Sequence, residues 1–239
     1  MKSIHNKLIW LTLFSIAMGF LETAIVIYLR KIYYPNGFVF PLASIDPGIA
    51  RIEFLREAAT VIMLIGIGII AGRTPSQRFA YFIYCFAIWD IFYYVFLKLL
   101  INWPASFFTW DILFLIPVPW IGPVLAPCIL TVTMSILALA IIYYSKDDRV
   151  VSITYKEWVL LITGSLIILF SFTKDYLNIL FMGDKQRVWT LAGKRSLFNE
   201  MNSYIPGSYN WMLFLVGELV ILYGIYIFII RIKDNRHAI

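Results

Sequence analysis

The stretch "FAYFIYCFAIWDIFYYVFLKLL", residues 79–100, contains two charged side chains, Asp90 and Lys98, among twenty uncharged residues. An α-helix of about 20 mostly apolar residues crosses roughly 30 Å of hydrocarbon. The stretch therefore predicts a membrane-spanning helix with an acid near its middle. A charged side chain at that depth costs about 2.5–3.5 kcal/mol on insertion scales, so Asp90 indicates a part of the helix that faces protein and not lipid.

Similar apolar stretches recur along the chain. The composition is 61% hydrophobic and 14% charged, whereas soluble domains are about 45–50% apolar and roughly 25% charged. The pattern predicts an all-α integral membrane protein, a bundle of six transmembrane helices in a single transmembrane domain over residues 1–239. The expected helices cover about 8–29, 51–72, 77–100, 122–144, 157–180 and 210–231.

The connection between the third and fourth expected helices has an unusual composition. Residues 110–120 are nearly all apolar, yet they include Pro117 and Pro119. Proline breaks helices, and unpaired backbone is not tolerated against lipid. We therefore expect a short interfacial or re-entrant helix in this connection, packed against the bundle.

Six crossings place both termini on the same side of the membrane. Lysine and arginine divide ten against ten between the two sides. Several basic residues on the side opposite the termini stand beside acids inside helix ends; when these are discounted, the positive-inside rule places the termini in the cytoplasm. The expected location is a bacterial or archaeal inner membrane. The net charge of +6 suits a surface of anionic lipid, and no basic run indicates nucleic acid.

The charged residues of the expected helices gather toward one side of the membrane. Asp90, Tyr94 and Lys98 recur every four residues, as do Glu22 and Arg30 around Val26, so each set forms a stripe on one helix face. Such stripes predict a polar layer in one half of the bundle. The candidate catalytic residues are Asp90, Glu22, Glu57, Glu218 and Asp111, and the candidate substrate-binding residues are Arg30, Arg56, Lys98, Lys174, Tyr94 and Trp110.

The chemistry available to this layer is that of carboxylates. Both histidines, His5 and His237, lie near the ends of the chain, the seven methionines are scattered, and no phosphate-binding glycine loop is present. We expect neither a cofactor nor a metal. Carboxyl groups in different surroundings can be held protonated and ionised side by side, which is the arrangement that acid–base catalysis uses.

Three functions are compatible with this pattern. The first is a membrane protein that binds or acts on an amphiphilic small molecule, lipid-like or isoprenoid-like, by carboxylate acid–base chemistry. The second is a structural or assembly subunit of a larger membrane complex, in which the charges join helices and the partner is another protein or a second copy of the chain. The third is a small transporter or channel, which needs polar residues through the full depth of the membrane. Membrane lipids are partners in all three.

Overall fold

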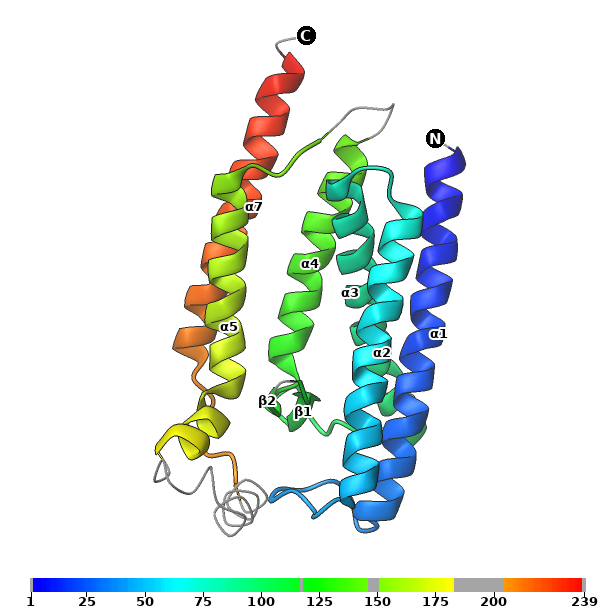
Figure 1. The fold of residues 1–239 in the computed structure, drawn as a ribbon, viewed down its shortest axis with the longest axis vertical. Coiled ribbons are helices and arrows are strands. Elements are labelled where there is room, and N and C mark those ends of the chain that lie inside the picture. The colour runs from blue at the N-terminus through cyan, green and yellow to red at the C-terminus, as the bar shows by residue number, and fades with distance from the viewer. Residues whose placement is uncertain (1, 117, 146–150, 183–203, 238–239) are drawn as a thin grey trace.

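The structure is a computed structural model that describes residues 2–116, 118–145, 151–182 and 204–237. Within these ranges, six helices are long and apolar enough to cross a membrane, which confirms the predicted helical bundle. Figure 1 shows them side by side, with both termini at one end of the bundle. The helices are α1 (Lys2–Tyr33), α2 (Pro47–Ala71), α3 (Pro75–Ile101), α4 (Leu125–Tyr144), α5 (Tyr155–Met182) and α7 (Trp211–His237).

Five of the six helices are longer than the apolar stretches that predict them, because polar residues at their ends continue the helix. The exception is α4, which begins at Leu125 instead of about 122 because Trp120–Pro123 forms β2. The helix α2 begins at Pro47, directly after Asp46, whose carboxylate accepts hydrogen bonds from the backbone N–H of Gly48 and Ile49. Thr74 accepts a bond from the backbone of Gln77 in the same way at the start of α3. These caps satisfy backbone donors that have no partner inside the helix.

The prediction of a short interfacial or re-entrant helix between α3 and α4 is wrong. The described part of this connection forms an antiparallel hairpin of β1 (Trp110–Phe114) and β2 (Trp120–Pro123), with Asp111 opposite Gly122. Isoleucine and the aromatic residues favour strands. A hairpin also pairs the backbone groups of one strand with those of the other, so the segment meets the requirement that had suggested a helix.

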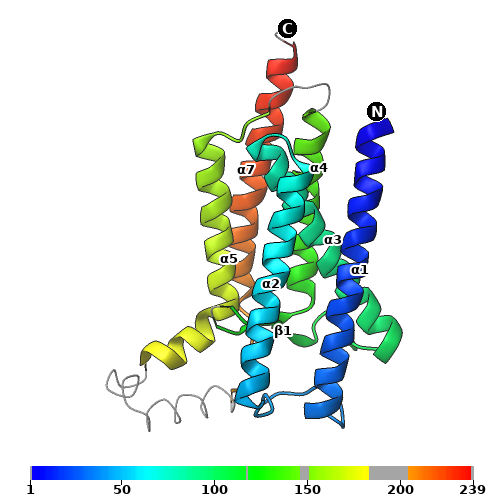
Figure 2. The same ribbon diagram turned by 45° about the vertical axis from the view of Figure 1, so that its right-hand side comes forward.

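The helix α3 lies at the centre of the first four helices, because α1, α2 and α4 all pack against it. The helices α5 and α7 form a second unit, packed closely along each other (Figures 1 and 2). The hairpin lies at the end of the bundle opposite the termini. Its strand β2 contacts both α4 and α5, so the hairpin joins the two units there.

Candidate functional site

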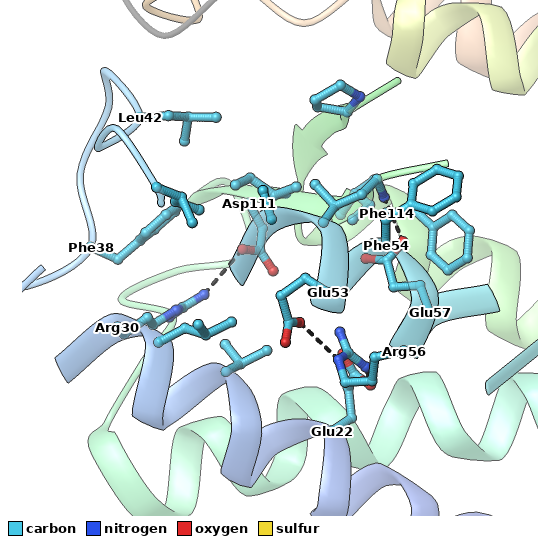
Figure 3. A pocket seen from close by; sticks show the side chains of 18 of the residues that line it. Glu22, Arg30, Phe38, Leu42, Glu53, Phe54, Arg56, Glu57, Asp111 and Phe114 are labelled. Carbon is cyan, nitrogen blue, oxygen red and sulfur yellow. Dashed lines mark hydrogen bonds and ion pairs between the residues drawn. The ribbon is translucent and has the colours of Figure 1, made fainter. Parts of the chain in front are cut away.

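A cavity of about 330 Å³ lies at the hairpin end of the bundle, between α1, α2, α3 and β1. The connection between α1 and α2 forms a further wall, and Tyr176 of α5 also reaches it. Most of the lining is apolar or aromatic. The apolar and aromatic lining residues include Val26, Leu29, Tyr33, Tyr34, Phe38, Leu42, Ile45, Phe54, Trp89, Ile112, Leu113 and Phe114. Figure 3 shows charged side chains from three elements converging among them.

Arg56 of α2 joins two acids in the wall of the cavity. Its Nε atom donates a hydrogen bond to Glu53 over 2.8 Å, and its Nη1 atom donates one to Glu22 of α1 (Figure 3). Both α1 and α2 pack on α3. This guanidinium also connects α1 and α2 to each other directly, because Glu22 belongs to α1 and Arg56 to α2. Arg56 is thus occupied by two carboxylates of the protein itself.

Arg30 of α1 pairs with Asp111 of β1. The Nη2 atom donates to the carboxylate over 3.1 Å, and the guanidinium lies 3.7 Å from the ring centre of Trp103. The hydroxyl groups of Tyr93 and Tyr94 also donate to Asp111, over 3.5 and 3.3 Å. Burial raises the pKa of Asp111 to about 6, and the Arg30 guanidinium offsets only part of this effect.

Glu57 of α2 holds the hairpin from the other side of the cavity. Its carboxylate accepts a hydrogen bond from the backbone N–H of Leu115 over 2.9 Å, just after β1 ends. Glu57 makes no ion pair within the described residues. The hairpin is therefore attached to α1 through Asp111 and to α2 through Glu57.

Asp90 of α3 lines the cavity and differs from the other acids there. It makes neither a hydrogen bond nor an ion pair with any residue that the structure describes. Asp111 and Glu22 are near enough to repel it electrostatically. Two residues of the lining also carry a buried donor without a partner among the described residues, Nη1 of Arg30 and Nε1 of Trp89, but neither atom is itself exposed to the cavity. The cavity thus presents one unpartnered acceptor group, the carboxyl of Asp90.

The structure brings together six of the eleven residues predicted for the site. Those that line the cavity are Glu22, Arg30, Arg56, Glu57, Asp90 and Asp111. Tyr94 does not line the cavity, but its hydroxyl group donates a hydrogen bond to Asp111, which does. The other four lie elsewhere, with Lys98 bonded to the carbonyl of Pro104, Lys174 4.0 Å from Asp175, Glu218 bonded to Thr133 and Trp110 against the ring of Tyr209.

Sequence reasoning missed two kinds of residue in the site. Glu53 stands one helical turn before Glu57 and shares the charged face of α2 that the sequence predicts, but it was not among the candidate residues. Phe38, Leu42 and Ile45 come from an irregular connection, where no periodicity predicts which side chains face inward.

The donor set of the site favours proton transfer and hydrogen bonding over metal binding. Among the described residues, no group of three or more His, Cys, Asp and Glu side chains is arranged to hold a metal ion. The guanidiniums also compete for the carboxylates that could serve as ligands. Asp90 and Glu57 are the carboxylates in the lining that are free of an ion pair with a described guanidinium, so they are available to a bound molecule.

Comparisons with known proteins assign no family to this chain. No protein-family model, no curated protein and no solved structure matches it. The function is therefore argued from the chemistry and position of the cavity alone.

Proposed function

We propose that this protein binds and acts on an amphiphilic small molecule, lipid-like or isoprenoid-like, in the cavity between α1, α2, α3 and the hairpin. The observation that carries the proposal is the carboxyl group of Asp90, which lines this cavity without a partner in the described protein. An acidic side chain inside a membrane-spanning helix costs free energy, so such a residue is a first candidate for a functional role. An acid that only held helices together would be bonded to a neighbouring helix, as Glu22 is to Arg56.

The position of the cavity suits a ligand that enters from the bilayer. Phe54 of α2 lines the cavity and is also 43% exposed, so we place the entrance of the cavity beside this ring. A molecule with an apolar tail can pass this ring and keep the tail beside lipid. Its polar head then meets Asp90 and Glu57 inside.

Acid–base chemistry is the reaction class that these two acids support. Neither carboxyl group is held by a guanidinium, so a proton can leave or join it without breaking an ion pair of the protein. Arg56 and Arg30 instead keep Glu22, Glu53 and Asp111 in fixed positions around them. In this scheme Asp90 exchanges the proton with the ligand, and Glu57 is the second acid.

Native mass spectrometry of the full chain, released gently from lipid nanodiscs, tests the proposal. We expect a bound small molecule on the wild type and its loss in Asp90→Asn, which removes the acid but breaks no contact within the described protein. Asp234→Asn is the matched control, because Asp234 is exposed on α7 and lies outside the cavity lining, and it should retain the ligand. A wild type without any ligand, or equal occupancy in Asp90→Asn, would overturn the proposal.

The assembly-subunit function is the second candidate, and the two ion-pair groups favour it. Arg56 ties α2 to α1, and Arg30 ties α1 to β1, so most of the charges in the lining already hold elements together. The same experiment separates the candidates. A co-purifying protein on a ligand-free wild type, together with variants that merely unfold, would support the assembly function.

A further inference from the structure

The charges that line the cavity do not balance. Five carboxyl groups, those of Glu22, Glu53, Glu57, Asp90 and Asp111, face two guanidiniums, those of Arg30 and Arg56. Both guanidiniums are already paired, Arg56 with two of the acids and Arg30 with one. Among the residues that the structure describes, whatever enters the cavity therefore meets an excess of acidic groups and no cation that is free of an acidic partner.

The aromatic residues of the cavity lining favour a cationic group. Trp89 and Tyr93 stand close to Asp90 in the sequence of α3 and line the cavity, as do Tyr33, Tyr34 and Phe38. Aromatic faces attract ammonium and guanidinium groups, and the cavity already uses this attraction, because Arg30 lies over the rings of Phe38 and Trp103. An ammonium ion beside Asp90 would gain the same interaction together with a charge-assisted hydrogen bond.

Two donors without partners add a second requirement. Nη1 of Arg30 and Nε1 of Trp89 have no acceptor among the described residues, and both atoms are buried behind the surface of the cavity that their residues line. A buried donor without a partner destabilises the folded state. A small movement of either side chain toward a ligand oxygen would give its donor an acceptor, which a bare alkylamine does not offer.

We infer that the ligand of this cavity is an amphiphile whose head carries a protonated amine next to a neutral or ester oxygen, with the amine bound at Asp90 and the oxygen at Arg30 or Trp89. This inference rests on the proposed function, because it names the head group of the molecule that the cavity takes. The head lies in the volume of about 330 Å³, which is within the range of small-molecule sites. The tail passes Phe54 toward lipid.

Three probes with one shared eight-carbon chain test the head group on the full-length protein in nanodiscs. They are an amino alcohol, a neutral diol and a hydroxy acid, and native mass spectrometry gives the dissociation constant of each. We expect the amino alcohol to bind the wild type about tenfold more tightly than the diol, and the hydroxy acid to bind most weakly, since one charge-assisted hydrogen bond accounts for a factor of that order.

Three variants assign the preference to the cavity. Asp90→Asn should bind the amino alcohol and the diol equally, and Asp90→Glu should restore part of the preference. Asp234→Asn, at an exposed position of α7 outside the lining, should behave as the wild type. In Ala50→Phe the added ring fills the cavity that Ala50 lines, so all three probes should lose specific binding. Thermal unfolding of each variant shows whether it is folded.

The outcomes separate the two proposals. If every probe binds the wild type and folded Ala50→Phe equally, the cavity is not a ligand site and the proposed function fails together with the head-group assignment. If the diol or the hydroxy acid binds the wild type as tightly as the amino alcohol, and Ala50→Phe abolishes this binding, the proposed function stands and the amine assignment is overturned.

Discussion

The guanidinium of Arg30 on α1 lies 3.1 Å from the carboxylate of Asp111 on β1, although 81 residues separate them in the chain. The pair is enclosed, with side-chain exposures of 10% for Arg30 and 2% for Asp111. It fixes the hairpin against the first helix and so closes one side of the cavity. The stability of the hairpin end should therefore depend on both members of the pair.

Arg30→Met should destabilise the protein by about 3 kcal/mol at pH 8, because it leaves the buried carboxylate of Asp111 without its cation. Methionine keeps most of the packing against Trp103 and Phe38. Adding Asp111→Asn to Arg30→Met should recover most of the loss. Unfolding in mixed micelles, followed by circular dichroism, measures both variants, and a double variant no more stable than Arg30→Met would contradict this account of the pair.

The stability of the wild type relative to Asp111→Asn should fall as the pH rises from about 4 to about 6. Burial raises the pKa of Asp111 to about 6 in the folded protein, whereas an exposed aspartate titrates near pH 4. Between these values the folded state holds more protons than the unfolded state, so stability decreases with pH. Arg30, Tyr93 and Tyr94 face this carboxylate, and Asp90 is near enough to interact with it electrostatically.

The measurement is the difference between the two unfolding midpoints at pH 4, 5, 6 and 7. The difference should change through the first three values and level off above pH 6. A difference that stays constant from pH 4 to pH 7 would show that Asp111 is not buried in the way described here.

The helices were predictable from the sequence, and the hairpin was not, for a physical reason. Each spanning helix is visible in the sequence as a run of about 20 apolar residues, because a helix of that length is needed to cross the hydrocarbon core of the membrane. The run from Trp110 to Phe114 is too short to distinguish a strand from a buried helical turn. Which of the two forms depends on a partner strand, and the pairing of Asp111 with Gly122 is a tertiary contact that no local pattern contains.

Half of the site was predictable because depth and helix face together bring residues into one layer. Glu22 and Arg30 share a stripe on α1, and both line the cavity. The depth of Glu218 in the membrane predicts that it belongs to the site, but Glu218 does not line the cavity. Glu218 faces α4, where it accepts a hydrogen bond from Thr133. The rotation of each helix about its own axis decides between these outcomes, and it is set by packing against neighbours and not by the sequence of that helix.

Gly164→Ala should destabilise the protein by about 1–3 kcal/mol through the contact between α5 and α7. A Cβ atom at Gly164 would lie 2.6 Å from Cγ1 of Ile221 and 2.7 Å from the carbonyl oxygen of Gly217. The backbone must move to admit it, so the two helices would separate. Small residues allow this kind of close approach in membrane helices.

Gly66→Ala is the matched control, because a Cβ atom at Gly66 on α2 would meet nothing within 4 Å. It should be neutral or slightly stabilising, since alanine favours the helix over glycine. Equal unfolding curves for Gly164→Ala and Gly66→Ala, measured in mixed micelles, would contradict the close packing of α5 on α7.

Thr133→Val should destabilise the contact between α4 and α7 by about 0.6 kcal/mol, the average for hydrogen bonds between membrane helices, and by no more than about 1.7 kcal/mol. Glu218 already has one carboxyl oxygen without a partner, and the change removes the donor to the other. Glu218→Gln keeps an acceptor for Thr133 and should cost less. Because Glu218 does not line the cavity, neither variant should alter ligand occupancy in native mass spectra. Loss of ligand in folded Glu218→Gln would place the functional site elsewhere.

Glu57 has two separable roles, and two substitutions distinguish them. Its carboxylate accepts the backbone N–H of Leu115 at the end of β1, over 2.9 Å. Glu57→Ala leaves that partly buried donor unsatisfied and should destabilise the folded state by about 1 kcal/mol. Glu57→Gln can still accept the bond through its amide oxygen, so its stability should remain close to that of the wild type. The two free energies of unfolding therefore measure the attachment of the hairpin.

The same pair of variants then separates the attachment from the proposed acid–base role. Glutamine cannot exchange a proton at this position, so Glu57→Gln should bind the ligand of the wild type and fail to convert it. The masses bound to Glu57→Gln and to the wild type, compared after incubation in the same lipid, show whether conversion has stopped. Glu57→Gln with wild-type stability and unchanged conversion would limit Glu57 to holding the hairpin and leave Asp90 as the remaining acid available for proton transfer.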